Sequence, residues 1–290
     1  MAITAAALVP HPPLLVPELG RGASPELDQL RSACRRAVTA ILDELDALLV
    51  VGPAPSWGEV QPGAIGSFAP YGAAVTTRLP TRPAAEGEAT PAAAAPAGAG
   101  SKRPDSRTVG SPAPGSTAVA PGGWLDRRHL PPGRLRELPL SLAVAAWLLG
   151  LEGEARQLPR VAAFGVEASA GVEQAVAAGR ALARAVVAGS RVGLLVMGDL
   201  SARRSPRAPG AFHPAAERFD RRIVDAIGKA EIGRLVDADP GLAAELRVGG
   251  MAVLWLLAGA LEDAGELRGE VLYEAAPFGV GYLVAVVESR

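Results

Sequence analysis

The sequence predicts an α/β fold in which a mostly parallel sheet carries helices on both faces and ends in an antiparallel strand pair. Short apolar runs alternate with longer segments of helical periodicity, which is typical of such a sheet. The C-terminal region adds two apolar runs around a turn-prone segment. At 290 residues the chain can bury a sizeable core. We therefore expect a single domain over residues 1–290 with one insertion at 81–123.

The N-terminal elements are expected to form a β-α-β unit. Ile3–Val9 is a short apolar run ended by prolines, which favours a buried strand. Residues 24–26 (Ser-Pro-Glu) are a helix start, because Ser caps, Pro suits the first helical position and Glu suits the positive helix end. Apolar residues then recur at three- and four-residue steps over 27–45. The next strand, 47–51, is closed by turn residues 52–55, and we expect it to pair with the first strand through a right-handed crossover.

Residues 81–123 differ in composition from the rest of the chain. They contain no Leu, Ile, Met, Phe, Tyr or Trp, and Gly and Pro occur throughout. A segment of this kind buries too little apolar area to offset its ordering entropy. We expect a low-complexity, disordered insertion in a surface loop; a functional tether is the alternative.

The same patterns assign the remaining elements. Further strands are expected at 73–79, 160–166, 191–197, 271–273 and 281–287, and helices at 138–149, 172–187, 214–227 and 251–261. The 214–227 helix is amphipathic, with apolar residues on one face and arginines turned outward: Phe219, Ile223 and Ile227 against Arg218, Arg221 and Arg222. The 251–261 helix is apolar on nearly every face, so it is either central core or a buried interface. The sequence leaves open whether the chain forms a homo-oligomer.

Charge, cysteine content and hydropathy exclude several classes of protein. The formal net charge of −1 gives no field that would recruit nucleic acid or anionic lipid. Cys34 is the only cysteine, which excludes an intramolecular disulfide and a thiolate zinc site. The N-terminus lacks the positive region of a signal peptide, and no uncharged run reaches the roughly 18–20 residues that cross a bilayer. We expect a soluble cytoplasmic protein without nucleic-acid or membrane partners.

Candidate chemistry lies in three segments that follow predicted strands. They are residues 10–13 (Pro-His-Pro-Pro), 52–55 (Gly-Pro-Ala-Pro) and 198–201 (Gly-Asp-Leu-Ser), and ligands collect beyond the carboxyl ends of parallel strands. His11 is the sharpest candidate, because a neutral imidazole binds a metal or acts as a base; the alternative is a hydrogen-bonded structural histidine. Asp199 either binds a cation or a substrate hydroxyl, or holds its own turn.

The other polar residues near these segments favour structural roles. Arg203, Arg204 and Arg207 suit a carboxylate or phosphate, but a solvated cluster is the simpler interpretation. His129 is expected to be solvated, and His213, directly before Pro214, to cap a helix locally. The sequence contains no phosphate-cradling glycine motif, nucleophile elbow or Cys/His metal spacing. From the residues alone the function stays open.

Three longer segments carry a family resemblance. LVPHPPLLVPELG, MGDLSARRSPRAPGAFHPAAERFDRRIVDAI and YEAAPFGVGYLVAVV resemble the LigB-like domain of class III extradiol ring-cleavage dioxygenases and the related Memo-like proteins. The GDLS and APFGVGY stretches are the most specific pieces. The resemblance covers both ends and the middle of the chain, leaves out the insertion, and is strongest to a diverged, Ala-rich actinobacterial branch. It implies a LigB-like α/β fold.

The resemblance also implies a degenerate iron site. Active members hold Fe(II) with two histidines and a glutamate and use another histidine as acid/base. The first histidine matches His11, whereas the second ligand falls on Ala54 and the acid/base group on Ala202. The glutamate aligns with Val248, and the nearest acid, Glu245, lies three positions earlier. Alanine has neither a lone pair for iron nor a titratable proton.

We therefore expect a non-catalytic small-ligand-binding or scaffold protein that needs no cofactor, and we assign no catalytic residue. Its pocket is expected to bind a small hydroxylated or anionic ligand and to be formed by His11, Pro12, Asp199, Ser201, Arg203 and Arg204. The alternative is an active non-haem Fe(II) aromatic-ring-cleaving dioxygenase with a rearranged site. In that case His11 and Asp199 would bind the metal together with His213 or Glu245.

Overall fold

The fold is described from a computed structural model, in which residues 3–20, 25–80 and 123–290 are placed. The expected insertion, apart from Gly123, and the expected capping residue Ser24 lie outside these described residues. The strands of the sheet are β1 (Ile3–Val9), β2 (Ala47–Ala54), β3 (Gly58–Ser67), β4 (Thr76–Arg78), β5 (Arg134–Glu137), β6 (Arg160–Glu167), β7 (Val192–Met197), β8 (Leu267–Ala275) and β9 (Tyr282–Ser289). The α-helices are α1 (Pro25–Leu42), α2 (Leu140–Gly153), α3 (Val172–Ala185), α4 (Ala216–Gly228), α5 (Pro240–Glu245) and α6 (Met251–Ala260).

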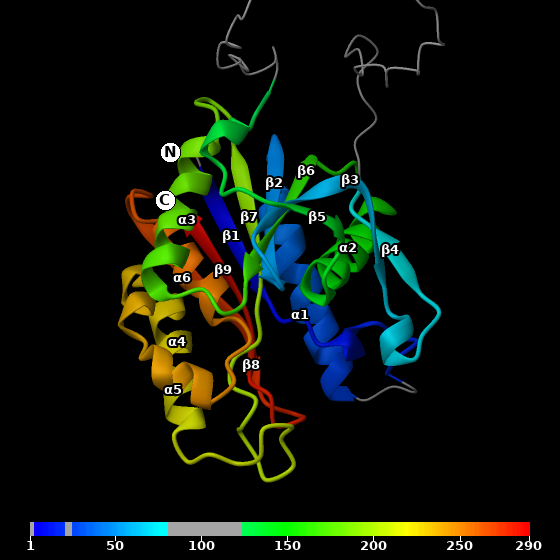
Figure 1. Cartoon of the computed structure of the whole chain (residues 1–290), viewed down its shortest axis with the longest axis vertical. Helices are drawn as coiled ribbons and strands as arrows, with labels where there is room; N and C mark the ends of the chain where they lie inside the picture. The colour runs from blue at the N-terminus through cyan, green and yellow to red at the C-terminus, as the bar shows by residue number, and fades with distance from the viewer. Residues whose placement is uncertain (1–2, 21–24, 81–122) are drawn as a thin grey trace, which may run out of the picture. The chain divides into compact units, whose positions relative to one another are not determined.

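The strands form one sheet in the order β4-β3-β6-β2-β7-β1-β9-β8, with β5 paired to β3 (Figure 1). Its centre is parallel, because β6, β2, β7 and β1 run in the same direction. Antiparallel strands flank this centre on both sides, including the predicted terminal pair of β8 and β9. The α/β class is therefore confirmed, but the sheet is mixed rather than mostly parallel.

The pairing of the first two strands was predicted wrongly. β7 lies between β1 and β2, so these strands are parallel without being neighbours. All six residues of β7 are buried, as expected for a strand that helices cover on both faces. The most apolar strand thus takes the centre of the sheet, which local sequence around β1 and β2 does not reveal.

Helices cover both faces of the sheet, as predicted. α3, α4 and α6 contribute to the core on one face, and α1 and α2 to the core on the other; Figure 1 shows these two sets on opposite sides of the strands. All ten residues of α6 are buried. The apolar helix is therefore central core. It packs against α3 through Gly179 and Gly259, where a Cβ would collide with backbone carbonyls of the other helix.

Several boundaries differ from the sequence prediction for physical reasons. β2 continues to Ala54, past the expected end at Val51, because β6 still pairs with it there. β7 no longer pairs with β2 beyond Val51, so the missing N–H of Pro53 is tolerated. α1 ends at Leu42, and Glu44 adopts a positive φ of 64° that breaks the helix before Leu45.

Two strands were not expected, and one was expected to be longer. β3 and β5 were missed because many of their residues are exposed and β3 contains a Pro-Gly pair. The strand expected at 73–79 is reduced to β4.

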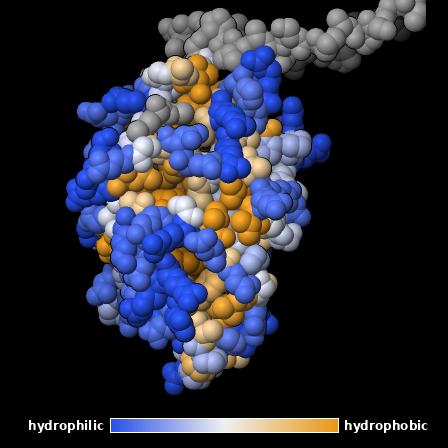
Figure 2. Space-filling view, turned by 90° about the vertical axis from the view of Figure 1, so that its left-hand side faces the viewer, coloured by the Kyte–Doolittle hydropathy of each residue, from blue (hydrophilic) through white to orange (hydrophobic). Residues whose placement is uncertain are grey.

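The surface agrees with the predicted amphipathic pattern of α4. Its apolar residues Phe219, Ile223 and Ile227 are buried, whereas Arg218, Arg221 and Arg222 are exposed. The side of the molecule on which α4 and α5 lie is hydrophilic over most of its area, with apolar residues between the polar ones (Figure 2). Within the described ranges, each helix is too short or too polar to cross a bilayer.

Candidate functional site

The segments that follow β1 and β7 meet at one edge of the sheet. The parallel register runs to Val9 opposite Met197, and the Gly198 N–H donates a 3.0 Å hydrogen bond to the Val9 carbonyl. One step further, the backbone N–H of His11 donates a 2.8 Å hydrogen bond to Oδ1 of Asp199. The strand-end location predicted for His11 and Asp199 therefore brings the two residues together.

The imidazole of His11 is held close to this carboxylate. Its side chain is 13% exposed, and Nδ1 lies 3.6 Å from Asp199 Oδ1, too far for a hydrogen bond. Nδ1 is buried and has no hydrogen-bond partner among the described residues. Because an unsatisfied buried polar atom costs free energy, this nitrogen is the atom of the site that still lacks a hydrogen-bond partner.

The charge of Asp199 reaches two groups on neighbouring elements. Burial, and then the Asp199 carboxylate, raise the pKa of the Tyr282 phenol at the start of β9. The same two causes raise the pKa of the Cys34 thiol in α1, which therefore stays protonated and is no nucleophile. Sequence reasoning missed Tyr282, although it ends the APFGVGY stretch. The antiparallel register of β9 on β1, with Leu8 opposite Ala285, carries Tyr282 toward His11.

The two most specific stretches of the sequence are hydrogen-bonded to each other. The Leu200 N–H donates to the Gly281 carbonyl at 2.9 Å, and the Gly281 N–H donates to the Ser201 carbonyl at 2.8 Å. The Arg204 N–H donates to the carbonyl of Gly279, which has a positive φ of 76° that favours glycine. GDLS and APFGVGY thus build one backbone frame around the end of β7.

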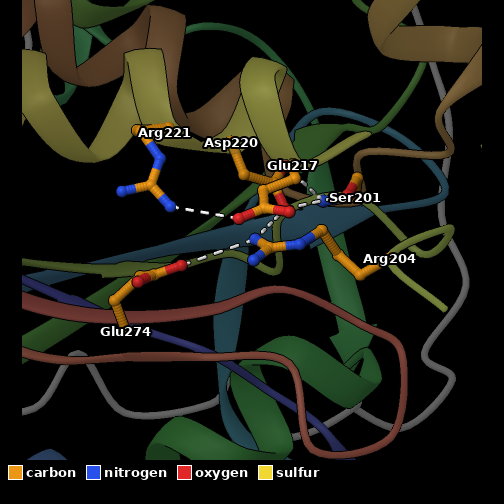
Figure 3. A network of polar contacts seen from close by, with 6 residues as sticks. All are labelled: Ser201, Arg204, Glu217, Asp220, Arg221 and Glu274. Atoms are coloured by element: carbon orange, nitrogen blue, oxygen red, sulfur yellow. Dashed lines mark hydrogen bonds and ion pairs between the residues drawn. The ribbon is translucent and has the colours of Figure 1, made fainter. Parts of the chain in front are cut away.

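Ser201 belongs to a buried polar network and not to the open ligand pocket that the sequence predicted (Figure 3). Its side chain is fully buried, and its N–H and Oγ donate to Asp220 Oδ1 and Oδ2 at 3.0 and 2.8 Å. Arg204 Nη1 donates to Asp220 Oδ2 at 3.1 Å and lies 3.4 Å from Glu274 Oε1. Burial raises the pKa of Asp220, partly opposed by the bonds from Ser201 and Arg204. The network ties the 198–204 loop to α4 and β8.

Asp220 was missed in the sequence analysis, but helical spacing contains a signal for it. It lies four residues after Ala216 and three before Ile223, on the buried face of α4. A carboxylate on such a face needs buried donors, and Ser201 and Arg204 supply them.

The remaining arginines of the loop do not present a free cationic pair to the site. Arg203 donates from Nε to the Ala211 carbonyl at 3.2 Å and from Nη1 to the Glu245 carbonyl at 3.1 Å. Arg207 is exposed. Together with the engagement of Arg204 by Asp220, these contacts mean that Arg203 and Arg204 hold the loop in place, in contrast to the solvated cluster that the sequence favoured.

His213 and Glu245 come together, but with each other. Nδ1 of His213 accepts a 3.2 Å hydrogen bond from the N–H of Ala215, the N-cap residue of α4, so His213 binds locally next to the helix start, although it is not the helix cap that the sequence predicted. Nε2 lies 3.1 Å from Glu245 Oε1. With both ring nitrogens engaged by the protein, His213 offers no lone pair to a metal. His129, in the 3₁₀ turn Arg127–His129, is exposed as predicted.

The residues at the other expected ligand positions carry no donor side chain. Ala54 is buried at the end of β2, opposite Glu167 of β6. Ala202 is partly buried, and its N–H donates to the Leu246 carbonyl at 3.0 Å. Across the described part of the chain, no three His, Cys, Asp or Glu side chains gather to hold a metal ion. The residues present therefore do not fit a site of two histidines and one carboxylate.

A groove lies elsewhere in the molecule. It has a volume of about 860 Å³ and runs between α1 and the β8–β9 pair. Arg31, Arg36, Arg268 and Glu270 are among the residues that line it, whereas His11 and Asp199 are not. We refer to it below as the α1 groove.

Comparison with known proteins adds information on the fold. No family model and no curated protein matches the chain. Among solved structures, the crystal structure of the uncharacterized protein JW3007 from Escherichia coli K12 is similar, with a TM-score of 0.52 and 16% sequence identity. The match covers 98% of this chain and 99% of that chain. At this identity the likeness shows the fold alone, and it extends along nearly the whole of both chains.

Proposed function

We propose that this chain is a diverged LigB-like protein that binds a small hydroxylated or anionic ligand beside His11 and Asp199 and does not cleave aromatic rings. The observation that carries the proposal is the unsatisfied Nδ1 of His11, buried 3.6 Å from Asp199 Oδ1 at the carboxyl edge of the parallel strands. That edge is where open α/β sheets hold their ligands.

The chemistry of the donor set argues against a catalytic iron. Ring cleavage in the resembled family needs two histidines and a glutamate on Fe(II) and a further histidine to move a proton. Here Ala54 and Ala202 take two of these places, and His213 and Glu245 are paired with each other. His11 and Asp199 alone leave a metal without the third protein ligand, so we derive no catalytic step through iron.

The residues of the site determine how a ligand would be held. Nδ1 of His11 accepts or donates according to the tautomer, and Asp199 accepts from a ligand hydroxyl. An anionic ligand would need protonated His11 to offset the charge of Asp199, because Arg203 and Arg204 are engaged within the loop. Hydroxylated ligands therefore match the site better than anionic ones.

The experiment compares the wild type with His11→Ala, using His129→Ala as a matched control at an exposed site. Thermal shift is measured with catechol and with inorganic phosphate as probes, and oxygen uptake is followed after addition of Fe(II) and catechol. We expect a ligand-induced rise in Tm that His11→Ala abolishes and His129→Ala keeps, without oxygen uptake. Oxygen uptake that depends on His11 would contradict the proposal and favour the rearranged dioxygenase.

A further inference from the structure

β8 ends the sheet on one side and is the least covered of its long strands. It pairs with β9, and its other edge pairs with no strand of the described residues. None of its nine residues is fully buried, whereas the first six residues of β9 all are. Such an edge presents a row of unpaired N–H and C=O groups, which proteins usually cover, shorten or pair.

The first half of β8 is complementary to itself in an antiparallel arrangement. With Gly269 opposite Gly269 of a second copy, Arg268 faces Glu270 and Leu267 faces Val271. Because alternate residues of a strand share a face, the two Arg–Glu pairs lie on one face and the two apolar pairs on the other. Opposite charges and apolar side chains are the cross-strand pairs that stabilise sheets.

The structure keeps these faces distinct. Arg268 and Glu270 both line the α1 groove, and Leu267 and Val271 both pack against the core that contains α4. The register of β8 on β9 is regular up to Val271 and shifts between Val271 and Tyr273. The self-complementary segment is therefore the regular part of the strand.

Arg268 and Glu270 form no ion pair within the described part of the chain. Arg268 and Glu270 are exposed, and neither forms an ion pair or a side-chain hydrogen bond with a described residue; Arg268 lies directly opposite Glu288 of β9, and nearby Glu266 and Arg290 pair with each other. An arginine and a glutamate that form no ion pair in the described chain, two residues apart on an open edge, face each other when the edge meets its own copy. From this pattern we propose that the chain forms a homodimer in which β8 pairs antiparallel with β8 of a second copy about Gly269.

The dimer continues the sheet across the two-fold axis, as isologous interfaces do. At about 3.3 Å per residue, β8 is roughly 30 Å long, and the α1 grooves of the two copies flank the new strand pair. Gly269 itself is explained within one chain, because a Cβ there would collide with the Ile227 carbonyl at the end of α4. Substitutions of Gly269 would therefore disturb the fold, and the charged pair provides the cleaner test.

The experiment is size-exclusion chromatography with light scattering on the full chain and its variants. In a dimer paired about Gly269, Arg268→Glu alone places Glu opposite Glu at two positions, and Glu270→Arg alone places Arg opposite Arg at two positions. The double variant R268E/E270R restores two opposite-charge pairs. Arg136→Glu is the matched control, because Arg136 is exposed in β5 near the other side of the sheet. Far-UV circular dichroism checks that each variant is folded.

We expect the wild type and Arg136→Glu to have twice the 29.5 kDa mass of one chain. Each single swap is expected to raise the dimer Kd at least about tenfold, and the double swap to return it to the wild-type range. A wild type that stays monomeric at about 100 µM, a typical weak-dimer concentration, would overturn the proposal. So would single swaps that leave the dimer unchanged, or a double swap that stays monomeric.

Discussion

Oδ1 of Asp199 accepts a 2.8 Å hydrogen bond from the backbone N–H of His11, while Nδ1 of the same histidine stands 3.6 Å away without a hydrogen bond. One carboxylate oxygen thus fixes the main chain after β1 to the main chain after β7. The imidazole is left positioned but unsatisfied. The structural role of Asp199 is therefore testable apart from the proposed binding role of His11.

The first prediction concerns the structural role of Asp199. Asp199→Ala removes the acceptor of a partly buried N–H, and we expect the free energy of unfolding to fall by about 1–3 kcal/mol. Asp199→Asn keeps an acceptor oxygen and should lose less than half of that amount. Urea unfolding followed by fluorescence measures both. Equal losses for the two variants would show that the hydrogen bond to His11 does not hold the strand ends together.

The second prediction concerns the buried network around Asp220. Asp220→Ala leaves the N–H and Oγ of Ser201 and the guanidinium of Arg204 without their acceptor, and a loss of about 3–5 kcal/mol is expected. Ser201→Ala removes one hydroxyl and keeps the backbone bond, so about 1 kcal/mol is expected. Chemical denaturation ranks the two variants. A larger loss for Ser201→Ala than for Asp220→Ala would overturn the assignment of Asp220 as the centre of the network.

The third prediction is a pH dependence with a defined sign. Burial raises the pKa of Asp220 above its ordinary value of 3.8, so the folded chain keeps this proton to a higher pH than the unfolded chain does. The stability that comes from this group is therefore present at low pH and is lost as pH rises from 3.8 through the raised pKa. Asp220→Asn cannot titrate. The free energy of unfolding of the wild type should fall relative to that of the variant across this window, and a rise would contradict the raised pKa.

The fourth prediction tests the contact between α3 and α6. Gly179→Ala places a methyl group against the Leu256 carbonyl, and since backbone cannot move aside cheaply, a loss of about 2–3 kcal/mol is expected. Gly150→Ala is the matched control in α2, where a Cβ meets nothing within 4 Å. That substitution should add up to about 1 kcal/mol through helix propensity. Thermal unfolding of both variants distinguishes close packing from a general intolerance of alanine.

The sequence predicted the elements that are marked by continuous apolar runs or by helical apolar periodicity. The buried strands β1, β6 and β7 and the helices α3, α4 and α6 begin and end within two residues of the predicted bounds. The strands β3 and β5 were missed because many of their residues are exposed and show no regular apolar alternation. Strand order was also out of reach, since the position of β7 between β1 and β2 depends on residues far along the chain.

The candidate site was predictable where it depends on strand ends, and not where it depends on contacts between distant residues. His11 and Asp199 come directly after β1 and β7, and these positions predicted that the two residues share one edge of the sheet. The same reasoning placed Ser201 in the ligand pocket. In the structure its hydroxyl instead donates to Asp220, nineteen residues along the chain. The pairing of His213 with Glu245 likewise joins two elements that no local pattern relates.

The proposal that the His11 site holds no catalytic iron is tested most directly by the metal content of the full chain, purified without oxygen and loaded with excess Fe(II). His11 and Asp199 supply at most two protein ligands at the strand ends, so after gel filtration we predict well below about 0.1 iron per chain, unlike a three-ligand site that retains its metal. About one tightly held iron per chain, lost in His11→Ala and kept in His129→Ala, would contradict the account.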